Sequence, residues 1–332
     1  MERNILADRL KGYACFLVLF GHVILGMRSG GVKVPAVFPA LESFIWSYHV
    51  PLFLFLSGAV YKITGAWKSK QTKAAFIRHK AISLGVPYVV FSVVYILINS
   101  LVGQTNTHSS LWDLLYIWKT PVAQYWYLYA LFFLFVIWTV FAGTLKNWQI
   151  TIFVTLAGYV APFFGVQFGC FEVVIFSALA FGLGTCLDIT KLTQISLWLK
   201  CVVVVLHIIV GAVLIWAQWI EKPIATELVM VLGIYASILL ISVAQRFAPV
   251  SWYLDFMNRY SLQIYLLHTI FTAGVRIVLL RLVVTNWVVH LIIGCAAGLG
   301  CSVLAALIAA KIPWMQFCFF PTKVLSAWKK SR

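Results

Sequence analysis

Charged side chains are scarce in this sequence, and acidic ones are the scarcest. Asp, Glu, Lys and Arg make up 10% of the 332 residues, with nine acids against 25 bases. Hydrophobic residues make up 63%, and the mean hydropathy is +0.97. A soluble domain of this size needs a far more polar surface. The composition therefore excludes one and predicts an all-α polytopic membrane protein.

Motifs for several chemistries are also missing. The seven cysteines include no CxxC pair and mostly fall inside apolar runs, so we interpret them as small core residues rather than disulfides or metal ligands. No Walker A loop, HExxH helix or GxSxG turn occurs, which excludes these motif-based routes to nucleotide hydrolysis, zinc proteolysis and serine hydrolysis. We therefore expect no metal site.

Apolar runs of membrane-spanning length recur along the whole chain. They predict about ten transmembrane helices, near 12–27, 42–61, 81–102, 124–145, 147–164, 170–187, 201–219, 224–245, 260–282 and 286–310. With ten spans and the N-terminus inside, 19 basic residues fall in inner segments and 6 in outer ones. This bias predicts an N-in, C-in topology, and it assigns the net charge of +16 to topology rather than to nucleic-acid binding.

The first span places three ionisable residues on one apolar helix. Asp8 and Lys11 precede an apolar run that ends at His22. Eleven residues at about 100° each make roughly three turns, so Lys11 and His22 share a face roughly 16 Å apart, with Asp8 near the same stripe. Placing these groups in hydrocarbon is costly, which favours a functional role. The alternative is that the histidine is a satisfied core residue, which is the commoner role of a lone histidine in an apolar helix.

Two further histidines stand in similar settings. His49 enters the second span from the outer side, two residues before Pro51, which tends to break or bend the helix. Since His22 lies in the outer half of the first span, the two imidazoles could meet near one depth. In the ninth span, Tyr265 and His268 are i,i+3 neighbours on a polar stripe. The alternatives are an interfacial helix cap at His49 and an interhelical hydrogen-bond seam in the ninth span.

Outside these histidines, a basic loop and two single residues are candidates for binding. The longest inner loop, from Lys62 to Lys80, carries six basic residues and no acid. Its charge suits either anionic lipid headgroups or a cytoplasmic ligand that carries phosphates. Trp126 opens the fourth span, where aromatic anchoring at the membrane interface is the usual role. Glu172, an acid in the apolar sixth span, is a candidate for a polar partner.

Together these stretches resemble the membrane-bound acyltransferase-3 family, the bacterial inner-membrane O-acyltransferases of surface glycans. The resemblance rests on five segments in the expected order: Asp8–Gly12 with His22, His49–Gly58, Gly85–Tyr88, Trp126–Leu128 and Ser261–His268. The family's motif of a cation, ten residues and a histidine falls on Lys11 and His22. Its RxxR element is not kept, because Lys80 and Ser83 occupy the two arginine places, although Arg78 is nearby. Residues 140–255 resemble the family only in hydropathy.

The resemblance implies a single membrane-embedded acyltransferase domain over residues 1–332, of the stand-alone sugar O-acetyltransferase type. It implies transfer of acetyl from cytoplasmic acetyl-CoA to a hydroxyl of a cell-surface glycan, or of its lipid-linked precursor, across the bacterial inner membrane. The implied partners are an acyl-CoA donor, a glycan acceptor and membrane lipids. The expected site residues are His22, Lys11, Asp8 and His49 for catalysis, Lys73, Arg78 and Lys80 for the donor, and Trp126, Tyr265, His268 and Glu172 for the acceptor.

In this interpretation His22 is a general base toward the acceptor hydroxyl or a transient acyl carrier. Asp8 and Lys11 pair and orient the inner end of the path, and His49 supports His22 or the oxyanion. The alternative is a carrier or flippase of lipid-linked sugars, or a proton-coupled exporter, that uses the same polar residues as a relay. Such a carrier more often shows internal repeats or paired broken helices, and here the sequence predicts only the break near Pro51.

Overall fold

Helices make up nearly all the secondary structure of this chain. The computed structural model describes residues 4–65, 70–102 and 110–330. Within these residues there is no β-strand, and nine helical stretches are long and apolar enough to cross a membrane. They are Ile5–Ser29, Val37–Ile63, Thr72–Leu101, Ala123–Phe141, Gly169–Cys186, Leu197–Trp216, Pro223–Ala244, Ser261–Arg281 and Trp287–Ala309. The chain is therefore an all-α polytopic membrane protein, as its composition predicts.

The expected span at 147–164 is the one that differs. It forms α6 (Asn147–Val160) followed by a short 3-10 helix, η3 (Ala161–Phe164). Gly165 comes next with φ 76°, a left-handed conformation that ends the helical run. At 1.5 Å per residue α6 is roughly 21 Å long, short of the roughly 30 Å of a hydrocarbon core. The described residues thus contain nine candidate spans instead of ten, and the N-in, C-in topology, which needs an even number, remains a prediction.

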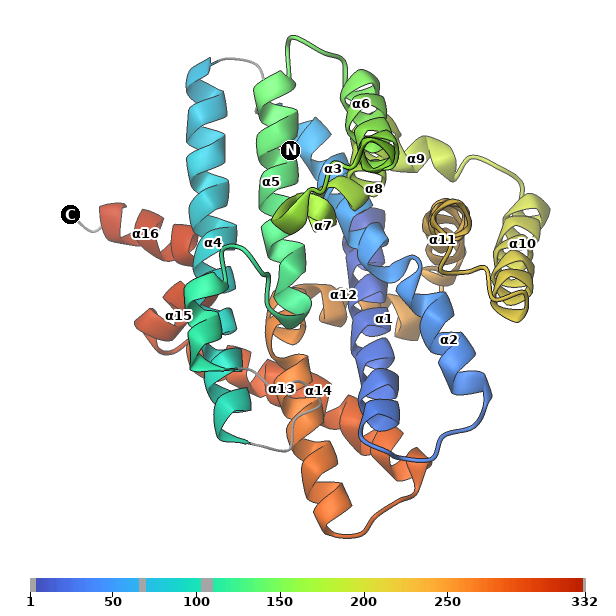
Figure 1. Ribbon diagram of the computed structural model, residues 1–332, viewed down its shortest axis with the longest axis vertical. Coiled ribbons are helices and arrows are strands. Elements are labelled where there is room, and N and C mark those ends of the chain that lie inside the picture. The colour runs from blue at the N-terminus through green and yellow to red at the C-terminus, as the bar shows by residue number, and fades with distance from the viewer. Residues whose placement is uncertain (1–3, 66–69, 103–109, 331–332) are drawn as a thin grey trace. The chain divides into compact units, whose positions relative to one another are not determined.

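The chain folds as two compact units, and unit 1 is built around α1 (Ile5–Ser29). Unit 1 comprises Met1–Leu56 and Leu187–Val303. In it α1 packs against α2 (Val37–Trp46), α11 (Pro223–Ala244), α12 (Ala248–Arg259) and α13 (Ser261–Arg281), while α10 (Leu197–Trp216) packs on α2 and α11 (Figure 1). The consecutive residues Leu17, Val18 and Leu19 are all buried, so α1 is covered on several sides and not along one stripe.

A break in the second span separates α2 from α3 (His49–Thr64). It falls at Ser47 and Tyr48, and the Ser47 hydroxyl donates to the carbonyl of Phe44 at 2.7 Å. Pro51 lies in the first turn of α3, where a proline is tolerated because that turn's N–H groups have no partner within the helix. The break predicted near Pro51 therefore occurs one turn before it and places His49 at the start of a new helix.

Unit 2 comprises Ser57–Cys186 and Leu304–Arg332. Its longest helix, α4 (Lys70–Leu101), runs beside α5 (Trp126–Phe141), and α15 (Pro313–Phe319) and α16 (Pro321–Lys330) pack on α4 (Figure 1). Aromatic rings fill its interior, with the Phe135 and Phe181 ring centroids 5.3 Å apart. A Cβ at Gly58 would lie 2.0 Å from the carbonyl oxygen of Phe181, so α3 meets the backbone of α8 (Ala178–Cys186) directly.

The remaining elements are short, except for α14 (Trp287–Ala309), which supplies one wall of the site described below. The short ones are η1 (Leu111–Tyr116), η2 (Ala123–Tyr125), η4 (Gly169–Phe171), α7 (Glu172–Phe176) and α9 (Ile189–Leu192).

Candidate functional site

Three of the predicted site histidines gather around one tryptophan in unit 1. The His22 ring of α1 lies 4.9 Å from the His268 ring of α13 and 4.9 Å from the Trp46 ring of α2, measured between centroids. Trp46 in turn lies 4.6 Å from His49, the first residue of α3. His22 interacts electrostatically with both other histidines. Four helices therefore bring one aromatic and three imidazole rings to a single cluster, which we call the histidine cluster.

Two members of the histidine cluster are held in a defined tautomer. The Nδ1 atom of His49 lies 2.8 Å from the carbonyl oxygen of Ile45, and Nδ1 of His268 lies 2.7 Å from that of Ile264. Because a carbonyl oxygen only accepts, each Nδ1 carries the hydrogen and each Nε2 presents a lone pair in the neutral ring. Both Nε2 atoms are buried with no hydrogen-bond partner in the described part of the chain. The cluster therefore offers two oriented acceptor nitrogens next to His22.

The helix break explains how His49 obtains its partner. Ile45 lies in the last turn of α2, and its carbonyl accepts the backbone N–H of Tyr48 at 3.2 Å. In an uninterrupted helix that carbonyl would accept the N–H of residue 49. Here it receives the His49 side chain instead. A local departure from regular helix thus fixes the imidazole orientation.

A pocket opens beside His22. It is lined by Val23, Gly26 and Met27 of α1 and by four residues of the neighbouring helices, Thr272, Arg276, His290 and Gly294. The pocket is open to the surface, and its interior has room for about one water-sized group. His22 is half-buried, whereas His290 is 2% exposed. The imidazole of His22 therefore lies in the wall of a pocket and is not sealed among apolar side chains.

Arg276 reaches this pocket through space that two glycines leave open. A Cβ at Gly26 would lie 2.5 Å from Nη1 of Arg276, and a Cβ at Gly30 would lie 2.9 Å from its Nε. His22, Gly26 and Gly30 are spaced by four residues, so they lie on one face of α1. His268, Thr272 and Arg276 have the same spacing on α13. The histidine face of each helix therefore continues into the pocket, and Arg276 is 8% exposed there.

A buried carboxylate holds Trp46 in place. Glu42, 6% exposed, accepts the indole N–H of Trp46 at 3.0 Å through Oε1, and its Oε2 lies 2.6 Å from Nη1 of Arg28. Since Trp46 contacts the rings of His22 and His49, the ion pair orients the tryptophan that separates them.

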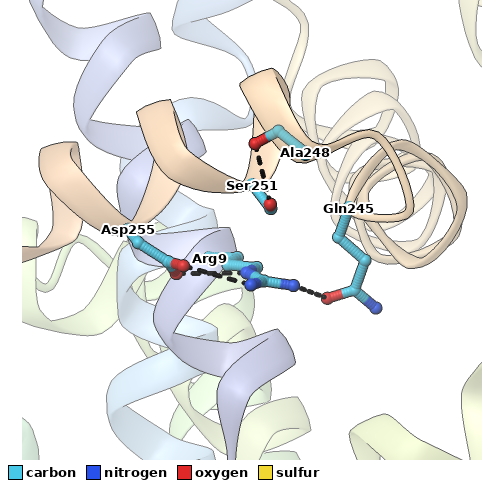
Figure 2. Close-up of polar contacts among 5 residues, drawn as sticks. All are labelled: Arg9, Gln245, Ala248, Ser251 and Asp255. Carbon is cyan, nitrogen blue, oxygen red and sulfur yellow. Dashed lines mark hydrogen bonds and ion pairs between the residues drawn. The ribbon is translucent and has the colours of Figure 1, made fainter.

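The predicted catalytic residues Asp8 and Lys11 lie at the other end of α1. Lys11 interacts electrostatically with Asp8. Between them, Arg9 donates to both carboxylate oxygens of Asp255 at 3.1 Å and to the side-chain oxygen of Gln245 at 3.2 Å (Figure 2). The motif residues around Lys11 thus join α1 to α11 and α12, and they lie three turns from the histidine cluster.

The predicted donor-binding residues belong to unit 2. Lys73 donates to the backbone carbonyl of Ala142 just past the end of α5, where a cation is favourable. The Lys80 ammonium lies 4.1 Å from the centroid of the Phe135 ring, a cation–π contact, and Arg78 is exposed. Residues 66–69 of the basic loop lie outside the described residues. Two of the three cations therefore contact the protein itself, and Arg78 faces outward.

The four predicted acceptor-binding residues divide between the two units. Trp126 is the first residue of α5, and Glu172 is the exposed first residue of α7, where an acid is favourable at a helix N-terminus. Tyr265 lies on α13 and its carbonyl is 3.1 Å from Nδ1 of His268. Of the four, the structure brings His268 into the histidine cluster, and Tyr265 contacts it through the backbone.

Sequence analysis missed Arg276, Trp46, Glu42 and His290. Arg276 counts as an outer cation by position, yet its four-residue spacing from Thr272 and His268 was a usable signal. Likewise, Trp46 and Glu42 are one turn apart just before His49. His290 donates through Nε2 to the carbonyl of Val284 at 2.8 Å, and its Nδ1 has no partner in the described residues. No group of three or more His, Cys, Asp or Glu side chains among the described residues is arranged to hold a metal ion.

Comparison with known proteins adds one finding to this geometry. The acyltransferase-3 family model, described as an acyltransferase domain, matches residues 5–307, nearly the whole chain. Comparisons with curated proteins and with solved structures gave no match. The matched range includes all four rings of the histidine cluster and the pocket beside it. This chain, an all-α multi-pass membrane protein, belongs to the acyltransferase-3 family of acyltransferases.

Proposed function

We propose that the protein transfers acetyl from cytoplasmic acetyl-CoA to a hydroxyl of a cell-surface glycan, or of its lipid-linked precursor, at the bacterial inner membrane. The observation that carries this proposal is the placement of His22 between the pocket and two buried imidazoles with free Nε2 lone pairs. Acyl transfer needs a group that accepts a proton near neutral pH in a site that excludes bulk water, and an imidazole meets this need.

In the proposed step His22 takes the proton of the acceptor hydroxyl while that oxygen attacks the thioester carbonyl. The tetrahedral intermediate collapses with cleavage of the carbon–sulfur bond, and the thiolate of coenzyme A receives the proton. His268 supports this exchange because its Nε2 atom can accept a hydrogen bond from His22, and the Nε2 atom of His49 can accept one from the acceptor. Trp46, held by Glu42, keeps the rings of His22 and His49 apart.

A covalent route through His22 uses the same residue as an acyl carrier. The thioester carbon then bonds first to an imidazole nitrogen with loss of the thiol, and the acceptor oxygen displaces that nitrogen in a second step. The two routes differ in one measurable respect. Only the covalent route leaves radiolabel on the protein when labelled acetyl-CoA is added without acceptor and the reaction is quenched within one turnover.

The basic loop supports the choice of donor. Its six cations with no acid between Lys62 and Lys80 suit the phosphates of coenzyme A, and Arg78 is exposed to solvent or ligand. In the predicted N-in topology this loop lies on the cytoplasmic side and the His22 end of α1 in the outer half of the membrane. The donor would then enter from the inside and the acceptor from the outside.

The test uses sealed vesicles that contain the full-length protein and radiolabelled acetyl-CoA, with and without acceptor glycan. We expect label on the glycan with the wild type and none above background with His22→Ala, although that variant stays inserted at a normal level. Undiminished labelling by His22→Ala would exclude His22 as the catalytic residue. Movement of glycan across the membrane without label would instead support a carrier. Mass spectrometry of surface glycan from cells with and without the protein should show the mass of one acetyl group.

A further inference from the structure

We propose that the pocket beside His22 binds an anionic group of the acceptor, a carboxylate or a phosphate, and that Arg276 is the residue that recognises it. The identification of this ligand as the acyl acceptor rests on the proposed function, whereas the anion site itself does not. The substrate is then a sugar whose reactive hydroxyl lies close to a negative charge.

The charge of the residues that line the pocket is the first reason to expect an anionic ligand. Among the residues that line it, Arg276 is the one that is always charged, and none is acidic. A guanidinium that is 8% exposed within a membrane-spanning helix is costly to desolvate. It lines the wall of the pocket, where a ligand of opposite charge can reach it.

The second reason is the space that Gly26 and Gly30 leave for the Arg276 side chain. Any side chain at Gly26 would collide with Nη1 of Arg276, and any side chain at Gly30 would collide with its Cδ and Nε. The surface of α1 is therefore cut away where the guanidinium lies, one and two turns beyond His22. This arrangement places the positive charge against the turns of α1 that follow His22.

The third step is the complementary polarity of His290. Its Nε2–H is used by the carbonyl of Val284, so its buried Nδ1 presents a lone pair that no described residue satisfies. A lone pair repels an anion but accepts a hydroxyl hydrogen. The pocket thus combines a donor fork for a carboxylate or phosphate with an acceptor for a hydroxyl. A sugar acid or a phosphorylated sugar carries both groups.

Binding of three chemically matched probes tests the proposal. They are methyl glucuronide, which carries a carboxylate, methyl glucoside, its neutral counterpart with the same ring, and glucose phosphate. Equilibrium dialysis with the purified full-length protein in lipid nanodiscs measures the dissociation constant of each, without acetyl-CoA. We expect the wild type to bind at least one anionic probe about tenfold or more tightly than methyl glucoside, as a charge-assisted pair requires. The tighter of the two anionic probes distinguishes a carboxylate source from a phosphate source.

Variants assign the effect to Arg276. Arg276→Gln should lose the preference for the anion, and Arg276→Lys should keep part of it. The matched control is Arg281→Gln, which removes an exposed charge from the same helix and should leave the preference intact. Gly26→Ala keeps the charge but displaces the guanidinium, so it should weaken anion binding even if Arg276→Gln fails to fold. Equal binding of all three probes by the wild type, or an equal loss in Arg281→Gln, would overturn the proposal.

The two proposals fail separately. Because dialysis involves no acyl donor, selective anion binding without acetyl transfer would refute the proposed function and leave the anion site standing. Acetyl transfer to neutral glycan, without selective binding of either anionic probe, would support the enzyme and refute the anion site.

Discussion

The two ends of α1 both carry glycines, but these glycines admit different neighbours. At the N-terminal end, a Cβ on Gly12 would lie 2.1 Å from the backbone carbonyl oxygen of Leu254 in α12. At the other end, a Cβ on Gly26 would meet the tip of the Arg276 side chain. Backbone cannot yield without moving a helix, whereas a side chain can rotate. Glycine therefore closes the packing at one end and makes room for a buried guanidinium at the other.

Charge follows the same division. At the Gly12 end, the side chains of Arg9 and Asp255 are 19% and 47% exposed, so water screens their attraction. At the other end, the carboxylate of Glu42 is 7% exposed and Arg276 is buried. The structure thus keeps its solvated ion pair where helices are joined and its buried charges where the histidine cluster lies.

The largest expected effect is at the histidine cluster. His22→Ala should lower the rate of acetyl transfer by about a thousandfold or more, because a positioned general base contributes roughly two to four decades of rate. His268→Ala should lower the rate less, since in the proposed mechanism His268 acts through His22. Both rates are measured in vesicles at equal protein level. A greater loss of rate in His268→Ala than in His22→Ala would indicate that His268 is the general base and His22 the supporting residue.

The next effect separates the two kinds of glycine. Gly12→Ala should lower the free energy of unfolding by about 2–3 kcal/mol, because the added methyl overlaps backbone that cannot move alone. Gly26→Ala should change stability far less, since the guanidinium can shift. Thermal unfolding of both variants in the same detergent measures the difference. Equal destabilisation would mean that the Arg276 side chain is as fixed as the backbone of Leu254. That result would contradict the proposed difference between the two glycines.

A smaller effect is expected at Glu42. Glu42→Gln loses the charge that pairs with Arg28 but keeps an oxygen for the indole N–H of Trp46, so it should retain most of the acetyl-transfer rate. Glu42→Leu loses both contacts, and the freed Trp46 should lower the rate about tenfold. Arg28→Gln is the control for the ion pair alone. If Glu42→Gln and Arg28→Gln both match Glu42→Leu, the charge matters rather than the position of Trp46.

Much of the architecture follows from hydropathy, because every spanning helix must cover the same thickness of hydrocarbon. That constraint predicts all nine of the observed candidate spans. It fails for 147–164, where Pro162 and Gly165 end α6 early. A window of apolar residues does not reveal a helix end set by backbone conformation.

The site was less accessible to sequence analysis. His22, His49 and His268 are polar residues in apolar helices. The free-energy cost of placing them in the membrane is enough to mark them as candidates for a functional role. Trp46 carries no such mark, and Arg276 has just its four-residue spacing from Thr272 and His268, since basic and aromatic residues are common at the ends of spans. Their importance arises from contacts between helices far apart in the chain. The roles of Lys73 and Lys80 could not be foreseen either, because a carbonyl at the end of α5 and a ring on it are supplied by packing.

The smallest expected effect is at the ion pair in Figure 2. A double-mutant cycle with Arg9→Gln and Asp255→Asn should give a coupling free energy below about 1 kcal/mol, since both side chains reach solvent and the pair is screened by salt. Raising the ionic strength should reduce this coupling further. A salt-independent coupling near 3 kcal/mol would show that the pair is effectively buried in the membrane. If the coupling is small while Gly12→Ala is strongly destabilising, then α12 is held to α1 by the close backbone approach at Gly12. Arg9, two residues before Lys11, would then orient α12 on α1 and add little to the stability of the protein.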